Sequence, residues 1–380
     1  MERMMTSCRS IGVVRLLGAG AAAAVLLSVE PGQRIEARDA VDVSVFATGL
    51  NDPRGIAFGP DQHLYVAEAG QGGGTLSTIG DCAQIQPPLG PAVGGTTGRI
   101  LEFAPTGGYA VVADGLPSTE AQAQVGGDRQ GVADLTFIGN HLLALEAGAG
   151  CSHGHIDANN GIFNVDRDGV SMLTDLSAWL LANPGAKGAE NPRNPDYEPD
   201  GTWYSMVFEN GRLYTVEPNH GLLVSVQPTD GRVQLVNELY TTFGDHTYTA
   251  LAADRGDLYV GTLGRIVFGP GGPDLTQSFA AGIYRLSRDG SATQVASGLH
   301  AVLGLAFDQQ HRLYALQSPI FVPGTGSLVR VNSDGSLEPI VTGLTFPSSL
   351  TRGPDEAFYI STCGYHCAPG QGGILRVTVQ

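Results

Sequence analysis

The sequence predicts an all-β fold, a six-bladed β-propeller whose blades are four-stranded antiparallel sheets. The first observation is a repeat: an apolar pair of the Leu-Tyr type occurs six times along the 380 residues, and a glycine-led apolar run follows each pair. The second is the high content of turn-forming residues, with 54 Gly and 22 Pro. A unit repeated at this period buries its faces only by stacking on copies of itself. The pairs are Leu64-Tyr65, Leu142-Leu143, Leu213-Tyr214, Leu258-Tyr259, Leu313-Tyr314 and Phe358-Tyr359, and the runs begin at Gly98, Gly161, Gly221, Gly282, Gly326 and Gly373.

Each repeat contains four segments with the alternation and β-branched content of strands. In the first repeat we expect strands at residues 54–58, 63–68, 98–103 and 109–113. In repeats two to five an Asp-Gly pair separates the third and fourth strands, and this pair supplies the positive φ that a tight hairpin requires. These pairs are Asp168-Gly169, Asp230-Gly231, Asp289-Gly290 and Asp334-Gly335.

The two ends of the chain are expected to close the ring. The sixth repeat lacks a fourth strand, because the chain stops shortly after the run at Gly373. Residues 41–47 precede any first strand and end in Thr48-Gly-Leu50, which matches the end of a fourth strand at Thr342-Gly-Leu344. We therefore expect residues 41–47 to complete the last blade and residues 41–380 to form a single domain, because closure removes an open sheet edge.

Two connections between blades are long, residues 118–131 before blade two and residues 182–202 before blade three. Residues 176–182 have the pattern of a short helix with Asp175 as its N-cap. Long ordered loops in a compact fold often carry function.

The first 37 residues are predicted to be a signal peptide. Arg3, Arg9 and Arg15 precede an apolar stretch at residues 16–27 that is too short to span a bilayer comfortably. Cleavage is placed after residues 35–37, and an uncleaved membrane anchor is the alternative. With the peptide removed, no membrane span is expected, and the protein would be secreted or periplasmic.

Net charge and lysine content limit the partners. The chain carries a net charge of −16, and its one lysine is Lys187. Nucleic acid is excluded as a partner, because phosphate binding needs clustered Lys and Arg. We expect a monomer that binds a small molecule or a protein, with neutral or cationic ligands and metal ions favoured.

Four cysteines follow the signal segment. Cys82 and Cys151 fall in matching loops of adjacent blades, and Cys363 and Cys367 share one loop. We expect these two disulfides in an oxidising compartment. A zinc site built from Cys363, Cys367 and either His366 or His153 is the alternative.

Three glutamates occupy the same position in three consecutive blades, Glu68, Glu146 and Glu217, each three residues after the apolar pair. Three carboxylates on one side of a ring would suit a divalent cation such as Ca²⁺, which binds several oxygens. The alternative is that each carboxylate caps backbone N–H groups of its own loop.

Asp134 begins the inner strand of blade two, where the other blades have Gly55, Ser205, Ala250, Gly304 and Ser349. A charge near the central channel must be paired or bind a ligand. Its partner is either Arg54 or Arg129, or else a bound molecule.

The loops of blades three and four supply the remaining candidate binding residues, Trp203, Tyr204, Asn219, His220 and His246. Propeller geometry places these loops on one face, where His220 and His246 are expected to converge near the aromatic residues. An aromatic hollow with a few polar groups suits a small organic ligand. A histidine bonded only to nearby backbone is the alternative for each.

Three loop motifs resemble the ScyD/ScyE family of exported bacterial propellers. They are Gly148-Ala-Gly-Cys-Ser-His-Gly154, Glu198-Pro-Asp-Gly-Thr-Trp-Tyr-Ser205 and Glu217-Pro-Asn-His-Gly221, and Asn51-Asp-Pro-Arg-Gly-Ile-Ala-Phe-Gly-Pro-Asp61 accompanies them. The resemblance covers residue 41 to the end. It implies an NHL-type propeller and export, without an assigned reaction.

Two functions follow from these observations. The first is a binding or accessory propeller that uses the loop face of blades two to four. The second is a metal-dependent hydrolase or lactonase, because the chain is also distantly similar to the SMP-30/gluconolactonase-like propellers, which hold a divalent metal in the channel. A comparable set could be drawn from Glu68, Asp134 and Asn219, although their positions do not match that family's ligand motif.

Overall fold

The computed structural model describes residues 35–38, 41–87, 89–105, 108–121, 128–190, 197–265, 268–269, 272–273, 280–319 and 322–379. Most of the predicted signal peptide, residues 1–34, lies outside the described residues. Within the described ranges, no helix combines the length and the apolar character needed to cross a membrane.

Six antiparallel sheets follow one another along the chain, which confirms the predicted six-bladed propeller. Blade one contains β3 (Pro53–Phe58), β4 (Leu64–Glu68), β5 (Val93–Phe103), β6 (Tyr109–Glu120) and a short β7 (Arg129–Gln130). Blade two contains β8 (Val132–Ile138), β9 (His141–Glu146), β10 (Gly161–Asp166) and β11 (Gly169–Asp175). Blade three contains β12 (Ser205–Glu209), β13 (Arg212–Glu217), β14 (Leu222–Val226) and β15 (Val233–Glu238).

The other three blades use the remaining strands and both ends of the domain. Blade four contains β16 (Thr247–Asp254), β17 (Asp257–Gly264), β20 (Ala281–Leu286) and β21 (Ala292–Leu299), with a separate hairpin of β18 (Phe268–Gly269) and β19 (Gly272–Pro273). Blade five contains β22 (Val302–Phe307), β23 (Leu313–Gln317), β24 (Gly326–Val331), β25 (Leu337–Leu344) and, at its outer edge, β1 (Glu36–Ala37). Blade six contains β26 (Ser349–Arg352), β27 (Phe358–Thr362), β28 (Gly372–Val379) and β2 (Val41–Leu50).

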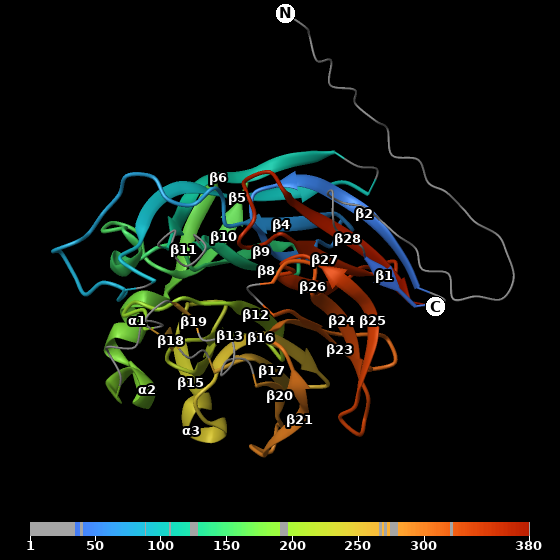
Figure 1. Cartoon of the computed structure of the whole chain (residues 1–380). Coiled ribbons are helices and arrows are strands. Elements are labelled where there is room, and N and C mark those ends of the chain that lie inside the picture. Colours follow the sequence, from blue (N-terminus) through green and yellow to red (C-terminus); the bar gives the residue numbers. More distant parts are fainter. Residues whose placement is uncertain are drawn as a thin grey trace, which may run out of the picture.

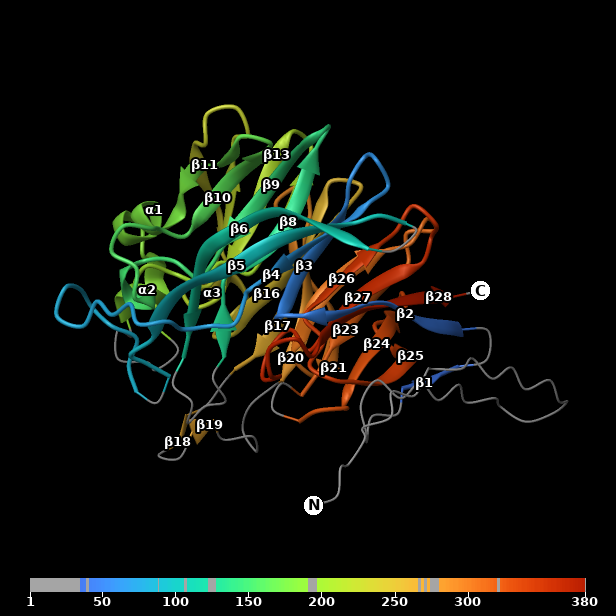
Figure 2. The same ribbon diagram turned by 90° about the horizontal axis from the view of Figure 1, so that it is seen from above.

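The ring closes as the sequence predicts. The inner strands contact one another in chain order, and β26 of the last blade contacts β3 of the first. β2 pairs with β28 from Val41 opposite Val379 to Leu50 opposite Gly372. Both views show the blue β2 beside the red β28 (Figure 1, Figure 2). The fourth strand of the last blade therefore comes from the start of the domain.

The pairing of β1 with blade five was not predicted. Glu36 lies opposite Thr342 and Ala37 opposite Val341, and Ile35 is buried. A contact of two residue pairs is too short to produce a visible period in the sequence. The segment just before β2 therefore covers part of the outer edge of blade five.

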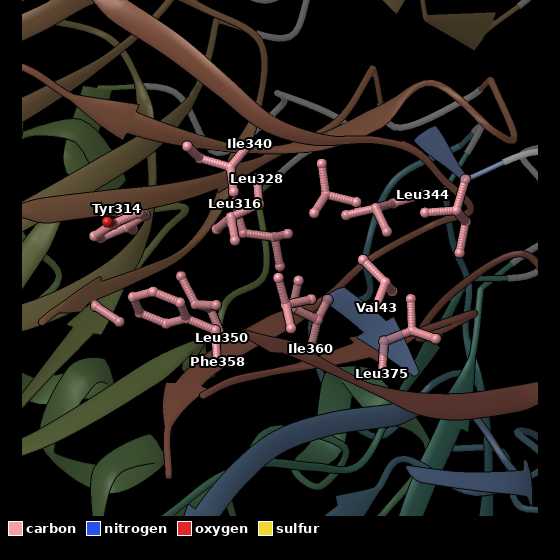
Figure 3. Close-up of a cluster of buried hydrophobic side chains, with 14 residues drawn as sticks. Val43, Tyr314, Leu316, Leu328, Ile340, Leu344, Leu350, Phe358, Ile360 and Leu375 are labelled. Atoms are coloured by element: carbon pink, nitrogen blue, oxygen red, sulfur yellow. The ribbon is translucent and has the colours of Figure 1, made fainter. Parts of the chain in front are cut away.

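Apolar side chains fill the space between neighbouring blades, because alternate residues of each strand face the next sheet. Figure 3 shows the cluster between blades five and six, where Val43 of β2 packs with Leu316, Leu328, Ile360 and Leu375. The closing strand thus adds to the core as well as to the sheet.

Helical segments lie in the connections of blades two and three. The predicted helix is present as α1 (Leu176–Ala182), and the Asp175 side chain accepts a hydrogen bond from Ala178 N–H. Three further segments were not predicted: the 3-10 turn η2 (Cys151–His153), α2 (Gly185–Glu190) and α3 (Leu239–Phe243). Part of the first long connection is strand, because β6 continues to Glu120 and pairs there with β7.

Candidate functional site

The inner strands surround a cavity of about 850 Å³ at the centre of the propeller. Small side chains on these strands leave the space open. They include Gly55, Ala57, Ala133, Ser205, Ala252, Gly304, Ala306 and Ser349. Gly55 also lets β3 approach β8 closely, because an added Cβ would lie 2.4 Å from the Asp134 Cα and the neighbouring backbone would have to shift. The cavity is therefore a direct result of small residues at equivalent positions in the repeat.

Asp134 reaches the cavity wall from β8. Its carboxylate accepts hydrogen bonds from Met206 N–H at 2.7 Å, Leu135 N–H at 2.9 Å and the Ser205 hydroxyl at 3.2 Å. Burial raises the pKa of Asp134 to about 7, although the three hydrogen bonds oppose this shift. The carboxylate is therefore held firmly, but by neutral donors.

Of the two alternatives for Asp134, the pairing with Arg54 or Arg129 is wrong. Arg54 donates to Asp128 at 3.2 Å and to the Arg129 carbonyl oxygen. Arg129 donates to Asp52 and to the Cys367 carbonyl oxygen, each at 2.8 Å. Both guanidinium groups are bound in the loops at the mouth of the cavity, where these other acceptors lie closer.

His153 and Glu198 form a second polar group in the cavity wall. His153 Nε2 lies 2.9 Å from Glu198 and its Nδ1 lies 3.5 Å from Asp200. Burial alone would lower the pKa of His153, but the hydrogen bonds and charges of the two carboxylates outweigh it and raise the pKa to about 10. Burial alone would likewise raise the pKa of Asp200, but its bond to His153 lowers it. His153 is thus an imidazolium between two carboxylates.

The role of Glu198 and Asp200 was not predicted from the sequence. Gln130 also donates to Glu198, at 3.2 Å, and the Ser152 N–H donates to Asp200 at 2.9 Å. These residues come from three loops that are far apart in the chain. In the sequence, Glu198 and Asp200 are marked only by their place in the motif at residues 198–205, which resembles the ScyD/ScyE family, as does the motif at residues 148–154.

The three glutamates at matching positions, Glu68, Glu146 and Glu217, each accept hydrogen bonds from nearby protein groups. Glu68 accepts hydrogen bonds from Asn51 N–H and from Arg99, and Glu146 accepts one from Gly148 N–H at 2.7 Å. Glu217 accepts from Thr202 N–H and His220 N–H. All three are almost completely buried. Glu146 and Glu217 each accept a hydrogen bond from their own loop, as the capping interpretation expects, whereas the donors to Glu68 belong to other segments. The metal interpretation stays a prediction.

Of the other predicted binding residues, Trp203, Tyr204 and Asn219 line the cavity. His220 and His246 are absent from its lining. His220 Nδ1 lies 3.1 Å from Glu217, and its ring lies against Tyr197, whereas His246 Nε2 lies 3.2 Å from the Tyr284 hydroxyl. The structure therefore places the two histidines in separate surroundings beside the cavity.

The structure confirms both disulfides, Cys82–Cys151 and Cys363–Cys367. The first joins the β4–β5 loop of blade one to η2 of blade two, directly beside His153. The second closes a five-residue loop whose Tyr365 and His366 line the cavity. Each disulfide therefore holds a loop that carries part of the cavity wall.

No family model matches the sequence, and no curated protein matches it. Solved structures with the same architecture include a gluconolactonase from Xanthomonas campestris, with a TM-score of 0.52 and 14% identity over 97% of this chain and 100% of that one. A calcium-binding regucalcin from Agrobacterium tumefaciens has a TM-score of 0.50 and 12% identity over 88% and 94% of the two chains. A soluble aldose sugar dehydrogenase from Escherichia coli has a TM-score of 0.50 and 14% identity over 90% and 100%. At these identities the likeness shows a shared propeller fold.

The carboxylates of the cavity do not fit a divalent metal. A divalent cation needs several ligands, whereas Asp134 supplies a single carboxylate and Glu198 is bound by His153 and Gln130. In the described part of the chain, the one group of three acidic or imidazole side chains with ligand atoms within 4.8 Å of one another is Asp61, His63 and Glu102, a set outside the cavity lining. Among the described residues the candidate metal group therefore lies outside the cavity lining, and the metal-dependent hydrolase stays a prediction.

Proposed function

We propose that this protein is an exported binding propeller of the ScyD/ScyE type, which holds a small organic molecule in its central cavity. The observation that carries the proposal is the cavity of about 850 Å³, which falls within the size range of small-molecule sites. The ligand would enter from the loop face, where the loops of blades one to three and six form the mouth.

The chemistry of the wall supports an organic ligand. The mouth contains the polar residues Arg54, Asp128, His153 and Glu198, whereas many of the inner-strand residues that line the shaft are apolar, among them Ala57, Leu305 and Phe307. A mostly apolar hollow with a few fixed polar groups is the usual form of a small-molecule site. Such a wall would bind an apolar body and orient it by its polar groups.

A substitution that fills the shaft tests the proposal. Ser349→Phe places an aromatic ring on β26 facing the cavity. Thr293→Phe places the same ring on exposed β21 and is the matched control. A fragment library would be screened by thermal shift, with Trp203 fluorescence as the second readout. Hits that bind the wild type and the control but not Ser349→Phe are expected. If the hits survive in Ser349→Phe, the ligand does not bind in the cavity.

Export is supported by the two disulfides, since such bonds persist in oxidising compartments. The test is mass spectrometry of the alkylated, unreduced protein from the periplasmic and secreted fractions of the native host. Four oxidised cysteines in an exported fraction are expected. A cytoplasmic protein with free thiols at Cys82 and Cys151 would reject export.

A further inference from the structure

We propose that the molecule bound in the cavity carries a cationic nitrogen, an ammonium or amidinium group, and that this group pairs with Asp134. The inference rests on the proposed function, because it names the ligand class of the same cavity. It depends on the charges in the cavity wall: among the described residues, Asp134 is a carboxylate whose hydrogen-bond donors are all neutral.

The carboxylates at the mouth each have a cationic partner. Asp128 is bonded by Arg54 at 3.2 Å, and Glu198 is bonded by His153 at 2.9 Å. Asp134 differs, because its three donors are two backbone N–H groups and the Ser205 hydroxyl. A carboxylate inside a protein must be paired or lose its charge. A ligand cation would supply the missing partner.

The groups around Asp134 agree with this difference. Among the strands that contact β8, Arg54 of β3 donates away to Asp128, and Glu146 of β9 is bound to Gly148 N–H. Burial raises the pKa of Tyr204, next to β12, and the charges of Asp128 and Asp134 add to this shift. Burial, and no neighbouring charge, accounts for the raised pKa of Asp134. A cation can therefore approach the carboxylate without competing with a protein cation.

Two further features favour a cation over an anion. Tyr204 lines the same cavity, and an aromatic face attracts a cation. The net charge of −16 attracts cations toward the protein and repels anions. The apolar shaft would hold the hydrocarbon part of the same molecule.

Matched probes test the inference by calorimetry. Phenethylamine and 1-naphthylmethylamine would be compared with 2-phenylethanol and 1-naphthalenemethanol, which have the same rings and a hydroxyl in place of the ammonium. The amines are expected to bind the wild type about ten- to a hundredfold more tightly, as a hydrogen bond to a charged group would give. Asp134→Asn should remove this preference, because the amide has no charge.

Proton release gives a readout that a purely structural role would not produce. Because the pKa of Asp134 is about 7, an amine that fixes the carboxylate as an anion should release about half a proton at pH 7. The release is measured from the binding enthalpy in buffers of different ionisation enthalpy. Amine affinity should rise between pH 6 and pH 8. Ser205→Ala removes one donor and keeps the charge, so it should keep the amine preference and move this pH dependence upward.

Several results of these experiments would contradict a pairing between a ligand cation and Asp134. The inference is overturned if an alcohol binds the wild type as tightly as its amine, or if the amine preference survives in Asp134→Asn. Proton uptake on amine binding would also overturn it. So would a failure of both amines to bind at millimolar concentration. If neutral library hits still disappear in Ser349→Phe, the proposed function stands while this inference fails.

Discussion

Replacement of His153 by Gln should reveal a large, pH-dependent contribution to stability. His153 is fully buried between Glu198 and Asp200, so His153→Gln removes a cation and leaves two carboxylates close together. Breaking a buried ion pair by removing one partner costs about 3–5 kcal/mol. We expect a loss of this size in the free energy of unfolding at neutral pH.

The pH dependence follows from the raised pKa of His153, about 10 in the folded state against 6.5 for the free side chain. The stabilisation is therefore complete below pH 6.5 and is lost as the pH rises toward 10. At about 1.4 kcal/mol per pH unit, about 4 kcal/mol remains at pH 7 and about 1 kcal/mol at pH 9. The stability difference between wild type and variant should accordingly shrink by about 2–3 kcal/mol between these two pH values.

Guanidinium unfolding followed by tryptophan fluorescence at pH 7, 8 and 9 measures this difference. His141→Gln, at an exposed position at the start of β9, is the control and should stay within about 0.5 kcal/mol of the wild type. A cost below 1 kcal/mol at pH 7, or the same cost at pH 7 and pH 9, would refute the ion-pair reasoning. His153 would then be a neutral packing residue.

Two predictions concern the fold. A variant that begins at residue 51 lacks β1 and β2, so it loses the buried Val43 and Leu50 side chains and exposes the edge of β28. Its free energy of unfolding should fall by about 3–6 kcal/mol, and it should aggregate on heating. In calorimetry a variant that begins at Ile35 should melt like the full chain, and equal melting temperatures for the two variants would contradict the closure. Gly55→Ala should lower the free energy of unfolding by about 1–3 kcal/mol, because its Cβ would meet the Asp134 backbone at 2.4 Å. Gly74→Ala is the control and should cost less, because the atom nearest to its Cβ lies at 3.2 Å. Equal costs in chemical unfolding would refute the close approach at Gly55.

The fold was predictable because propeller blades repeat. Each Asp-Gly hairpin and each apolar pair marks the same place in a blade. Because the sixth repeat lacks a fourth strand, residues 41–47 are predicted to supply it. The β1 pairing and the extension of β6 to Glu120 were not predictable in the same way. Both depend on backbone hydrogen bonds at a sheet edge, which place few demands on side-chain pattern.

The candidate site was predictable where a residue departs from the repeat. Asp134 stands at a position where the other blades have small residues, and for this reason it was identified. The partners of the arginines were not identified, because Asp52, Asp128 and Asp200 belong to loops with no common register. Loop conformation brings these groups together, and a linear pattern carries little information about it.

The charged groups at the mouth of the cavity are paired with one another, and this pairing bears on ligand specificity. Arg54 with Asp128, Arg129 with Asp52, and His153 with Glu198 and Asp200 bind one another, so a ligand that competed for any of them would first have to break a bond within the protein. Such groups shape the mouth and hold its loops, but they give little net attraction. Among the described residues Asp134 has no such internal cation, because its donors are two backbone N–H groups and a hydroxyl. Selection among ligands that fit the cavity should therefore depend on Asp134 more than on the more conspicuous charges at the mouth.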